Sequence, residues 1–128
     1  MIYLDSSVAL AQLFGEGRSP PDALWQEPLV SSRLLEYEIW NRVHARGFGA
    51  ALGASVRELI GRLRLIGLTP PALARALQPF PVPVRTLDCL HLATIEFIRA
   101  EGETVELASY DNRLLAAARA LGIAASQL

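Results

Sequence analysis

Acidic side chains placed directly after predicted strands are the feature of this sequence with the clearest chemical potential. Asp occurs only four times in the 128 residues, and Asp5, Asp88 and Asp111 each stand at a strand end or in the first turn of a helix after extended chain. Glu38, about two turns into another predicted helix, is a fourth candidate. Singly, each acid has a simpler explanation, as a helix-stabilising charge or a solvated surface charge. Jointly they indicate a site, because a parallel sheet brings its strand ends together at one edge.

A group of acids of this kind needs a compensating cation. Two carboxylates ~4 Å apart repel by roughly 4 kcal/mol at an effective dielectric constant of about 20, so three or four cannot all ionise together unaided. Oxygen ligands select a hard metal such as Mg²⁺ or Mn²⁺, which keeps open positions for phosphate oxygens and activates water for phosphodiester cleavage. Whether Glu36 or Glu38 faces such a site stays open, because the two point in different directions on a helix.

Neutral and basic residues near the acids complete the candidate site. Ser6, Ser109 and Asn112 are close enough in the sequence to the acids to orient water or substrate. Arg42 and Arg85 are the candidates for phosphate contacts.

The elements that must position these residues alternate along the chain. Short β-like runs cover 2–4, 29–32, 65–68 and 105–109, with a further candidate at 123–125, and a loop covers 15–21. Helical patterns cover 8–14, 22–26, 33–46, 50–64, 70–77, 87–100 and 112–121, with Ser6 or Ser7 expected to cap the first and Thr86 the helix at 87–100. This order predicts an α/β fold with a parallel sheet of four to five strands, helices on both faces, and a helical hairpin formed by 33–46 and 50–64.

Composition narrows the class of protein. The 128 residues fit one domain, and no uncharged apolar run approaches the ~18 residues of a membrane span. A net charge of −1 and a pI of about 6.1 exclude a protein that coats nucleic acid by bulk positive charge, so any such contact must be local. The single cysteine, Cys89, forms no internal disulfide or zinc pair, and no signal-peptide pattern opens the chain, so we expect a cytoplasmic protein without a membrane anchor.

Four segments spread over the whole chain carry a combined motif. They are IYLDSS at 2–7, SSRL at 31–34 leading to Glu38 and Arg42, RTLDCLHLA at 85–93, and SYDNRL at 109–114 running into AAA at 116–118 and Gly122. Together these segments resemble the PIN-domain family, and most of all the VapC-type toxin ribonucleases of bacterial toxin–antitoxin pairs.

The resemblance implies a fold, an activity and a site. The fold would be a three-layer α/β/α domain over residues 1–128 with a short parallel sheet. The activity would be Mg²⁺- or Mn²⁺-dependent hydrolysis of structured RNA, such as tRNA or rRNA, with water as nucleophile and 5′-phosphate product ends. The family's acidic site maps onto Asp5, Glu38, Asp88 and Asp111, with the first three holding metal and Asp111 completing the site or positioning water. Spacing from Ser32 and Arg42 favours Glu38 over Glu36.

The resemblance also implies partners, and two other classes of function stay open. The partners would be a second copy of the chain and a small VapB-type antitoxin whose tail enters the acidic pocket. A metal-dependent phosphohydrolase acting on a small phosphate ester would use the same carboxylates. A catalytically silent binding module with this fold would be marked by the loss of one acid, whereas all four positions are occupied here.

A histidine and three aromatic residues have simpler explanations than a role in the site. His91 follows Asp88 by one helical turn, but in an apolar helix it is more simply a buried structural histidine. Three aromatic residues could stack on RNA bases, but packing in the core or against a partner protein explains them more simply: Trp25, Trp40 and Tyr37.

Overall fold

The computed structural model describes residues 1–15 and 17–128 of the chain; residue 16, inside the loop predicted over 15–21, lies outside the described residues. In this described part the sheet consists of β1 (Ile2–Leu4), β2 (Leu29–Ser32), β3 (Arg64–Ile66) and β4 (Glu106–Ala108). The α-helices are α1 (Ser6–Phe14), α2 (Leu34–Ala45), α3 (Gly49–Gly61), α4 (Pro70–Ala76), α5 (Thr86–Ala100) and α6 (Asn112–Ala120), and η1 (Asp22–Gln26) is a short 3₁₀-helix.

The strands form one parallel sheet in the order β3-β2-β1-β4. The chain moves outward from β1 to β2 and β3, then returns to place β4 on the other side of β1. The strand order therefore reverses between β1 and β4. In open α/β sheets, ligands bind beyond the carboxyl ends of the strands at such a switch point.

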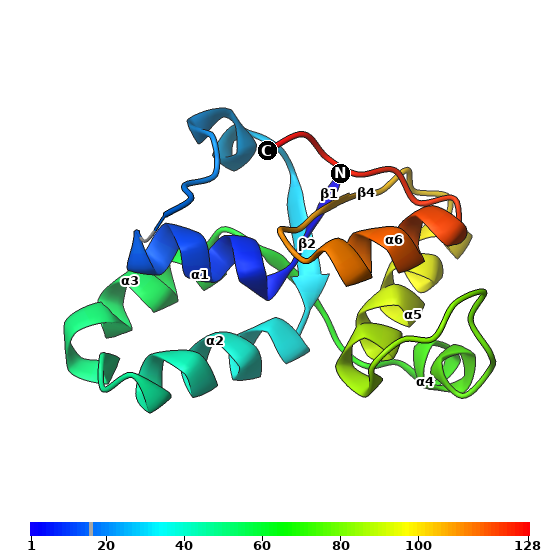
Figure 1. Ribbon diagram of the computed structural model, residues 1–128, viewed down its shortest axis with the longest axis horizontal. Coiled ribbons are helices and arrows are strands. Elements are labelled where there is room, and N and C mark those ends of the chain that lie inside the picture. Colours follow the sequence, from blue (N-terminus) through cyan, green and yellow to red (C-terminus); the bar gives the residue numbers. More distant parts are fainter. Residues whose placement is uncertain (16) are drawn as a thin grey trace.

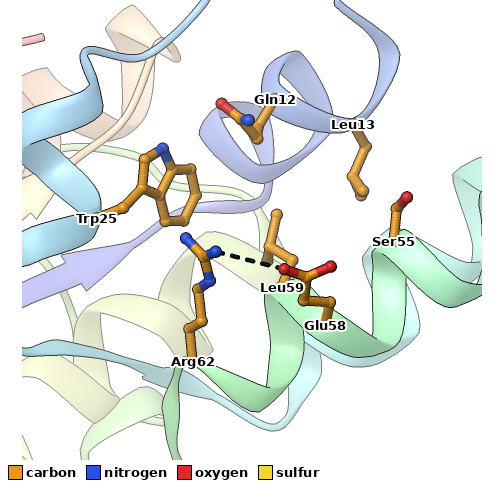
Figure 2. A pocket seen from close by; sticks show the side chains of 7 residues that line it. All are labelled: Gln12, Leu13, Trp25, Ser55, Glu58, Leu59 and Arg62. Atoms are coloured by element: carbon orange, nitrogen blue, oxygen red, sulfur yellow. Dashed lines mark hydrogen bonds and ion pairs between the residues drawn. The ribbon is translucent and has the colours of Figure 1, made fainter.

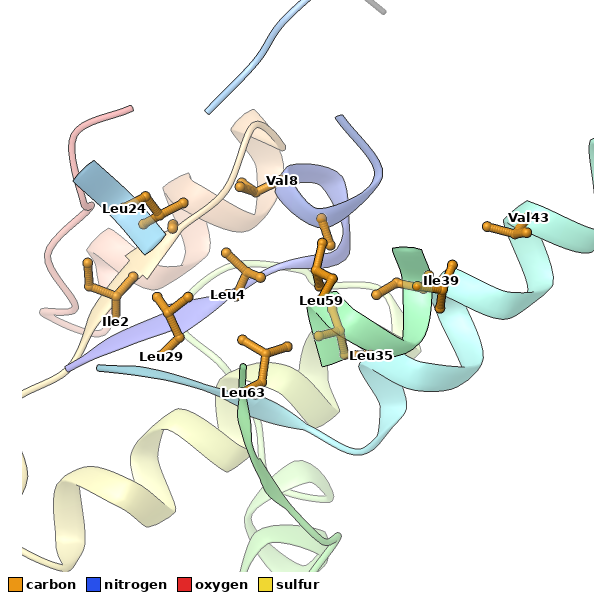
Figure 3. Packing of buried hydrophobic residues seen from close by; sticks show 13 residues of the cluster. Ile2, Leu4, Val8, Leu24, Leu29, Leu35, Ile39, Val43, Leu59 and Leu63 are labelled. Atoms are coloured by element: carbon orange, nitrogen blue, oxygen red, sulfur yellow. The ribbon is translucent and has the colours of Figure 1, made fainter. Parts of the chain in front are cut away.

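Helices cover both faces of the sheet, which confirms the predicted three-layer α/β/α fold. Figure 1 shows α1, α2 and α3 on one side of the strands and α4, α5 and α6 on the other. Ile2 and Leu4 pack with α1, α2 and α3 in one core cluster, drawn in Figure 3, whereas Tyr3 packs with α5 and α6 in the other. Successive strand residues point to opposite faces, so one short strand supplies both cores.

The sheet differs from the sequence prediction at its edges. The third strand begins at Arg64 and not at residue 65, because the helix predicted to run to 64 ends at Gly61. The predicted fifth strand over 123–125 is only an isolated parallel bridge between Leu107 and Ala125. Hydrogen bonds join Leu107 to Ala124 and Ser126, so this C-terminal segment covers the outer edge of β4.

Two helix caps also differ from the prediction. The helix predicted to start at 8 begins at Ser6, and its cap is not Ser6 or Ser7 but Asp5, whose carboxylate accepts from the Ser7 N–H. This confirms the simpler explanation of Asp5 as a helix-stabilising acid. Thr86 is not the cap of α5: it is the first helical residue, and Arg85 occupies the cap position without a side-chain hydrogen bond. Within residues 1–15 and 17–128, no helix has the length and apolar character needed to cross a membrane.

Candidate active site

Asp5 lies at the switch point, directly after β1. Its backbone N–H donates to the Ala108 carbonyl at 3.0 Å, which ties the ends of β1 and β4 together. The side chain is buried, and its Oδ2 accepts from the hydroxyls of Ser7 (2.6 Å) and Ser109 (2.8 Å). Among the described residues, none donates a hydrogen bond to Oδ1. One oxygen of Asp5 is thus fixed to the protein and the other is left over.

Ser109 and Asp111 follow β4 and meet Asp5 from the neighbouring strand. The Ser109 hydroxyl, which donates to Asp5, accepts from the Asp111 N–H at 2.9 Å. Oδ1 of Asp111 accepts from two backbone N–H groups in the first turn of α6, at 2.9 and 3.2 Å. Oδ2 of Asp111 lies 3.3 Å from Nη2 of Arg85. Asp111 therefore also divides its two oxygens between a helix cap and the site.

Of the two glutamates left open by the sequence, only Glu38 faces the end of β1. Its Oε2 accepts from the Ser6 hydroxyl at 3.2 Å, and its Oε1 lies 2.5 Å from Nε2 of His91. Glu36 turns outward and pairs with Arg33 at 3.1 Å. Glu38 consequently contacts both α1 and α5.

Asp88 lies in the first turn of α5, with 17% of its side chain exposed. Partial burial raises the pKa of Asp88, the charge of Asp111 raises it further, and Asp5 adds to this effect. Arg85 opposes the shift: its Nε lies 3.7 Å from Asp88 Oδ2, while its Nη2 faces Asp111. Three carboxylates therefore share one electrostatic neighbourhood, and a single guanidinium bridges two of them.

A buried chain of hydrogen bonds connects this neighbourhood to the core. The Tyr3 hydroxyl lies 2.7 Å from Nδ1 of His91, whose Nε2 faces Glu38, and it accepts from the Ser32 N–H at 3.2 Å. Tyr3 and His91 are 0% and 1% exposed, so neither side chain relies on water for a partner. The expectation of a buried structural histidine is confirmed as to burial, but one of its partners is an acid of the candidate site.

Burial and charge act on both members of this chain. Burial raises the pKa of Tyr3 far above its usual range, so the hydroxyl keeps its proton. Burial lowers the pKa of His91, but the hydrogen bond to Glu38 and the charges of the nearby carboxylates outweigh it and leave that pKa raised.

The side chains of the four candidate acids are of the chemical type that binds a hard cation. All four candidate residues offer carboxylate oxygens, which Mg²⁺ and Mn²⁺ prefer, and Oδ1 of Asp5 is left over. No three Asp, Glu, His or Cys side chains of residues 1–15 and 17–128 stand together in a group that could hold a metal ion. The arrangement therefore fits an ion bound by one or two carboxylates and water, as is usual for Mg²⁺, and not a closed protein cage.

The remaining predicted residues lie at the surface. Arg42 and Asn112 are exposed, and so is Arg85, whose side chain is 64% exposed. Trp25 and Trp40 pack partly buried against the core, as expected, whereas Tyr37 is 74% exposed.

A pocket of about 210 Å³ lies apart from the acids, between α1, η1 and α3 (Figure 2). Figure 2 shows Trp25 of η1 and Arg62 on one side of it, with Arg62 paired to Glu58 at 3.4 Å. None of the four candidate acids lines it. The candidate chemistry is therefore at the open edge of the sheet and not in this pocket.

Two residues of the site escaped the sequence analysis. Ser7, considered only as a helix cap, donates to Asp5 and accepts from the Tyr110 N–H at 2.9 Å. The sequence pattern identifies Tyr3 only as part of an apolar strand. The sequence feature that could have identified Tyr3 is the alternation of side chains along β1. It places Tyr3 on the face opposite Ile2 and Leu4, where its buried hydroxyl needs a hydrogen-bond partner.

Comparison of the sequence with known proteins identifies relatives over nearly the whole chain. No model of a protein family matches the chain. It is 34% identical over 128 residues to Ribonuclease VapC46 of Mycobacterium tuberculosis, covering 96% of this chain and 94% of that protein. It is 30% identical over 129 residues to Ribonuclease VapC47 of the same species, covering 95% and 93%.

Two solved structures that contain toxins have folds similar to that of this chain. The crystal structure of VapC20 of Mycobacterium tuberculosis, described as a sarcin–ricin loop cleaving toxin, gives a TM-score of 0.72 at 19% identity and covers 100% of both chains. A toxin–antitoxin complex from Klebsiella pneumoniae gives a TM-score of 0.68 at 18% identity and covers 91% of each chain. These two structures therefore share the three-layer fold of this chain. On the similarity to its curated relatives, the chain belongs to the VapC family of ribonucleases.

Proposed function

We propose that this chain is an endoribonuclease, a single PIN domain over residues 1–128 that hydrolyses structured RNA such as tRNA or rRNA. In this proposal it is the toxin of a toxin–antitoxin pair and acts in the cytoplasm. The observation that carries the proposal is the link between Asp5 and Asp111 through Ser109 at the switch point between β1 and β4, with the charge of Asp88 coupled to both and Glu38 bonded to Ser6 beside Asp5. The names of the relatives, Ribonuclease VapC46 and VapC47, support RNA as the substrate.

The proposal includes Mg²⁺ or Mn²⁺ at the four acids Asp5, Glu38, Asp88 and Asp111, bound directly or through water. When bound, such an ion supplies an activated water and offsets the negative charge that develops on the phosphate. The electrostatics of Asp88 support this part, because burial, and after it the charges of Asp111 and Asp5, raise the pKa of Asp88, and a bound cation would offset all three effects.

The chain's other residues would orient the reactants. Ser7 and Ser109 hold Oδ2 of Asp5, and Oδ1, which receives no hydrogen bond from the described residues, would face the ion. Ser6 and His91 each hold one oxygen of Glu38, and Asn112 stands exposed beside Asp111 to orient water. Arg42 and Arg85 are exposed and would contact phosphates, with Arg85 exchanging its carboxylate partners for the RNA backbone.

We expect Asp5→Asn and Asp88→Asn each to abolish cleavage, because each removes a carboxylate that the proposed ion requires. The measurement is single-turnover cleavage of transcribed tRNA and rRNA fragments in Mg²⁺ or Mn²⁺, against the same reaction in excess chelator. Asp22→Asn is the matched control, since Asp22 is an exposed acid of η1 outside the site, and this variant should cleave like the parent.

The same assay separates the rival functions. Equal cleavage by the Asp5 and Asp88 variants and the parent would refute the site. Activity on nucleotides or other small phosphate esters, without activity on RNA, would indicate a phosphohydrolase. A folded parent that is inactive on both would indicate a binding module.

We further propose a homodimer and an inhibitory antitoxin of the VapB type. The similarity to the chain from a toxin–antitoxin complex supports an antitoxin partner. Co-purification of the tagged protein from its own host, followed by identification of any small protein bound, tests the partner, and light scattering of the purified chain tests the dimer.

A further inference from the structure

We propose that His91, supported from behind by Tyr3, is a positioning residue that holds the Glu38 carboxylate in place at the acidic edge of the sheet. The inference rests on the proposed function, in which Glu38 belongs to the metal site. It concerns two residues that are not among the proposed metal ligands and whose side chains are almost completely buried.

The direction of the hydrogen bonds follows from the chemistry of the groups. A carboxylate only accepts hydrogen bonds, so Nε2 of His91 carries a hydrogen and donates to Oε1 of Glu38. In the neutral ring, Nδ1 is then an acceptor, and the Tyr3 hydroxyl, 2.7 Å away, donates to it. The backbone N–H of Ser32 donates in turn to the Tyr3 oxygen at 3.2 Å. In either protonation state of the ring Nε2 donates to Glu38, and the contacts connect β2 through β1 and α5 to Glu38 on α2.

Packing fixes the two aromatic rings. Tyr3 and His91 meet edge to face, with ring centroids 5.8 Å apart and planes at 78°. Both side chains are almost completely buried. A ring enclosed in this way cannot turn without leaving polar atoms unpaired in the core, which costs about 1–3 kcal/mol per group. His91 therefore presents Nε2 from one fixed point.

Glu38 is the side chain that needs such support. It has three rotatable side-chain bonds, and 21% of the side chain remains exposed. His91 holds Oε1 and Ser6 holds Oε2, so the carboxylate plane is set from two helices. Asp5 has similar support from Ser7 and Ser109. Partners that orient ligating carboxylates typically change metal affinity or activity by about 10–100-fold when they are removed.

Three substitutions separate positioning from simple packing. His91→Phe keeps an aromatic ring but removes both nitrogens, His91→Gln restores an amide donor near the place of Nε2, and Tyr3→Phe removes only the hydroxyl behind the ring. Thr94→Val is the matched control, because it removes a buried hydrogen bond of the same helix, from the Thr94 hydroxyl to the Leu90 carbonyl (2.7 Å), away from Glu38.

The readouts are Mn²⁺ affinity without RNA, kcat and KM on RNA, and the ¹³C signal of the Glu38 carboxyl without metal, assigned by its loss in Glu38→Gln. We expect His91→Phe to weaken Mn²⁺ binding and lower kcat by about 10-fold or more with little change in KM, and to shift or broaden the Glu38 signal. His91→Gln should recover most of each effect, Tyr3→Phe should fall between, and Thr94→Val should lose only stability.

Two outcomes would overturn the inference while the proposed function stands. One is a folded His91→Phe protein with the parent's Mn²⁺ affinity, kcat and Glu38 signal. The other is a Thr94→Val protein that loses as much affinity and rate as His91→Phe at a comparable loss of stability. A parent that neither binds Mn²⁺ nor cleaves RNA would overturn the proposed function itself, and the role of His91 with it.

Discussion

At the scale of the residue, a carboxylate at this site serves the fold and the candidate chemistry at once. Asp5 caps α1 through Oδ2 and keeps Oδ1 free of hydrogen bonds from the described residues. Asp111 caps α6 through Oδ1 and turns Oδ2 toward Arg85. Capping a helix and belonging to a site are therefore compatible explanations, because a carboxylate has two oxygens that can act separately.

The two glutamates of α2 allow a matched test at this scale. Glu38→Gln should abolish RNA cleavage and weaken Mn²⁺ binding, because it removes the charge that faces Ser6 and His91. Glu36→Gln should leave both unchanged and alter the free energy of unfolding by less than about 1 kcal/mol, because its partner is the exposed Arg33. Cleavage assays, Mn²⁺ titrations and urea unfolding of the two proteins check this. Loss of cleavage in the Glu36 variant alone would reverse the assignment.

The sequence was sufficient to predict the positions of Asp5 and Asp111 but not the support for Glu38. Asp5 follows β1 directly and Asp111 lies three residues beyond the end of β4, so the parallel order of the strands alone brings the two to the same edge. The contacts among Tyr3, Glu38 and His91 depend on the angles at which β1, α2 and α5 pack, with 88 residues separating Tyr3 from His91. Local patterns carry no information about such angles.

At the scale of the element, the first turn of α5 has a residue at its cap position that contacts the candidate site and does not cap the helix. Arg85 holds the cap position without capping the helix, and its guanidinium instead reaches Asp88 and Asp111. A capping Thr86 was a reasonable expectation from helix statistics. The expectation was wrong because Thr86 has already entered the helix, which places Asp88 in the first turn.

Arg85→Gln is predicted to strengthen metal binding in the absence of RNA. The guanidinium compensates Asp88 and Asp111, so its removal leaves a more negative site that attracts Mn²⁺ more strongly. The loss of unfolding free energy in chelator should stay below about 1 kcal/mol, because an exposed ion pair contributes little. Isothermal titration with Mn²⁺ measures the affinity without RNA, so it is independent of any role of Arg85 in binding phosphate.

Arg62→Gln is the control for this substitution, because Arg62 pairs with Glu58 away from the acids. This variant should bind Mn²⁺ like the parent. Weaker Mn²⁺ binding by Arg85→Gln than by the parent would contradict the view that Arg85 competes with the ion.

At the scale of the whole molecule, the sheet order and the two cores decide where chemistry is possible. β1 lies between β2 and β4 and is buried on both faces, so its carboxyl end opens at the centre of the molecule between helices from both layers. The alternating order of strands and helices was enough to predict three layers and parallel strands. The edges were harder to predict, because whether residues 123–125 form a strand or a single bridge depends on the few hydrogen bonds available at the side of β4.

The melting temperature of the protein should depend on the negative charge of the acids at the carboxyl ends of the strands. The pKa of Asp88 is raised by burial and by Asp111, so the ionised form is disfavoured in the folded protein and the neutral form is favoured. Asp88→Asn makes that position permanently neutral, so at neutral pH and in chelator its melting temperature should equal or exceed that of the parent. The rise in melting temperature that Mg²⁺ gives the parent should be lost in Asp88→Asn, because a ligand stabilises a protein only through the folded state that binds it.

Thermal unfolding of the parent, Asp88→Asn and Asp22→Asn, each in chelator and in Mg²⁺, measures both effects. Asp22→Asn is the control and is expected to behave like the parent. If Asp88→Asn melted well below the parent in chelator, Asp88 would be a structural acid stabilised by Arg85, and its burial and its repulsion by the other carboxylates would not outweigh that ion pair.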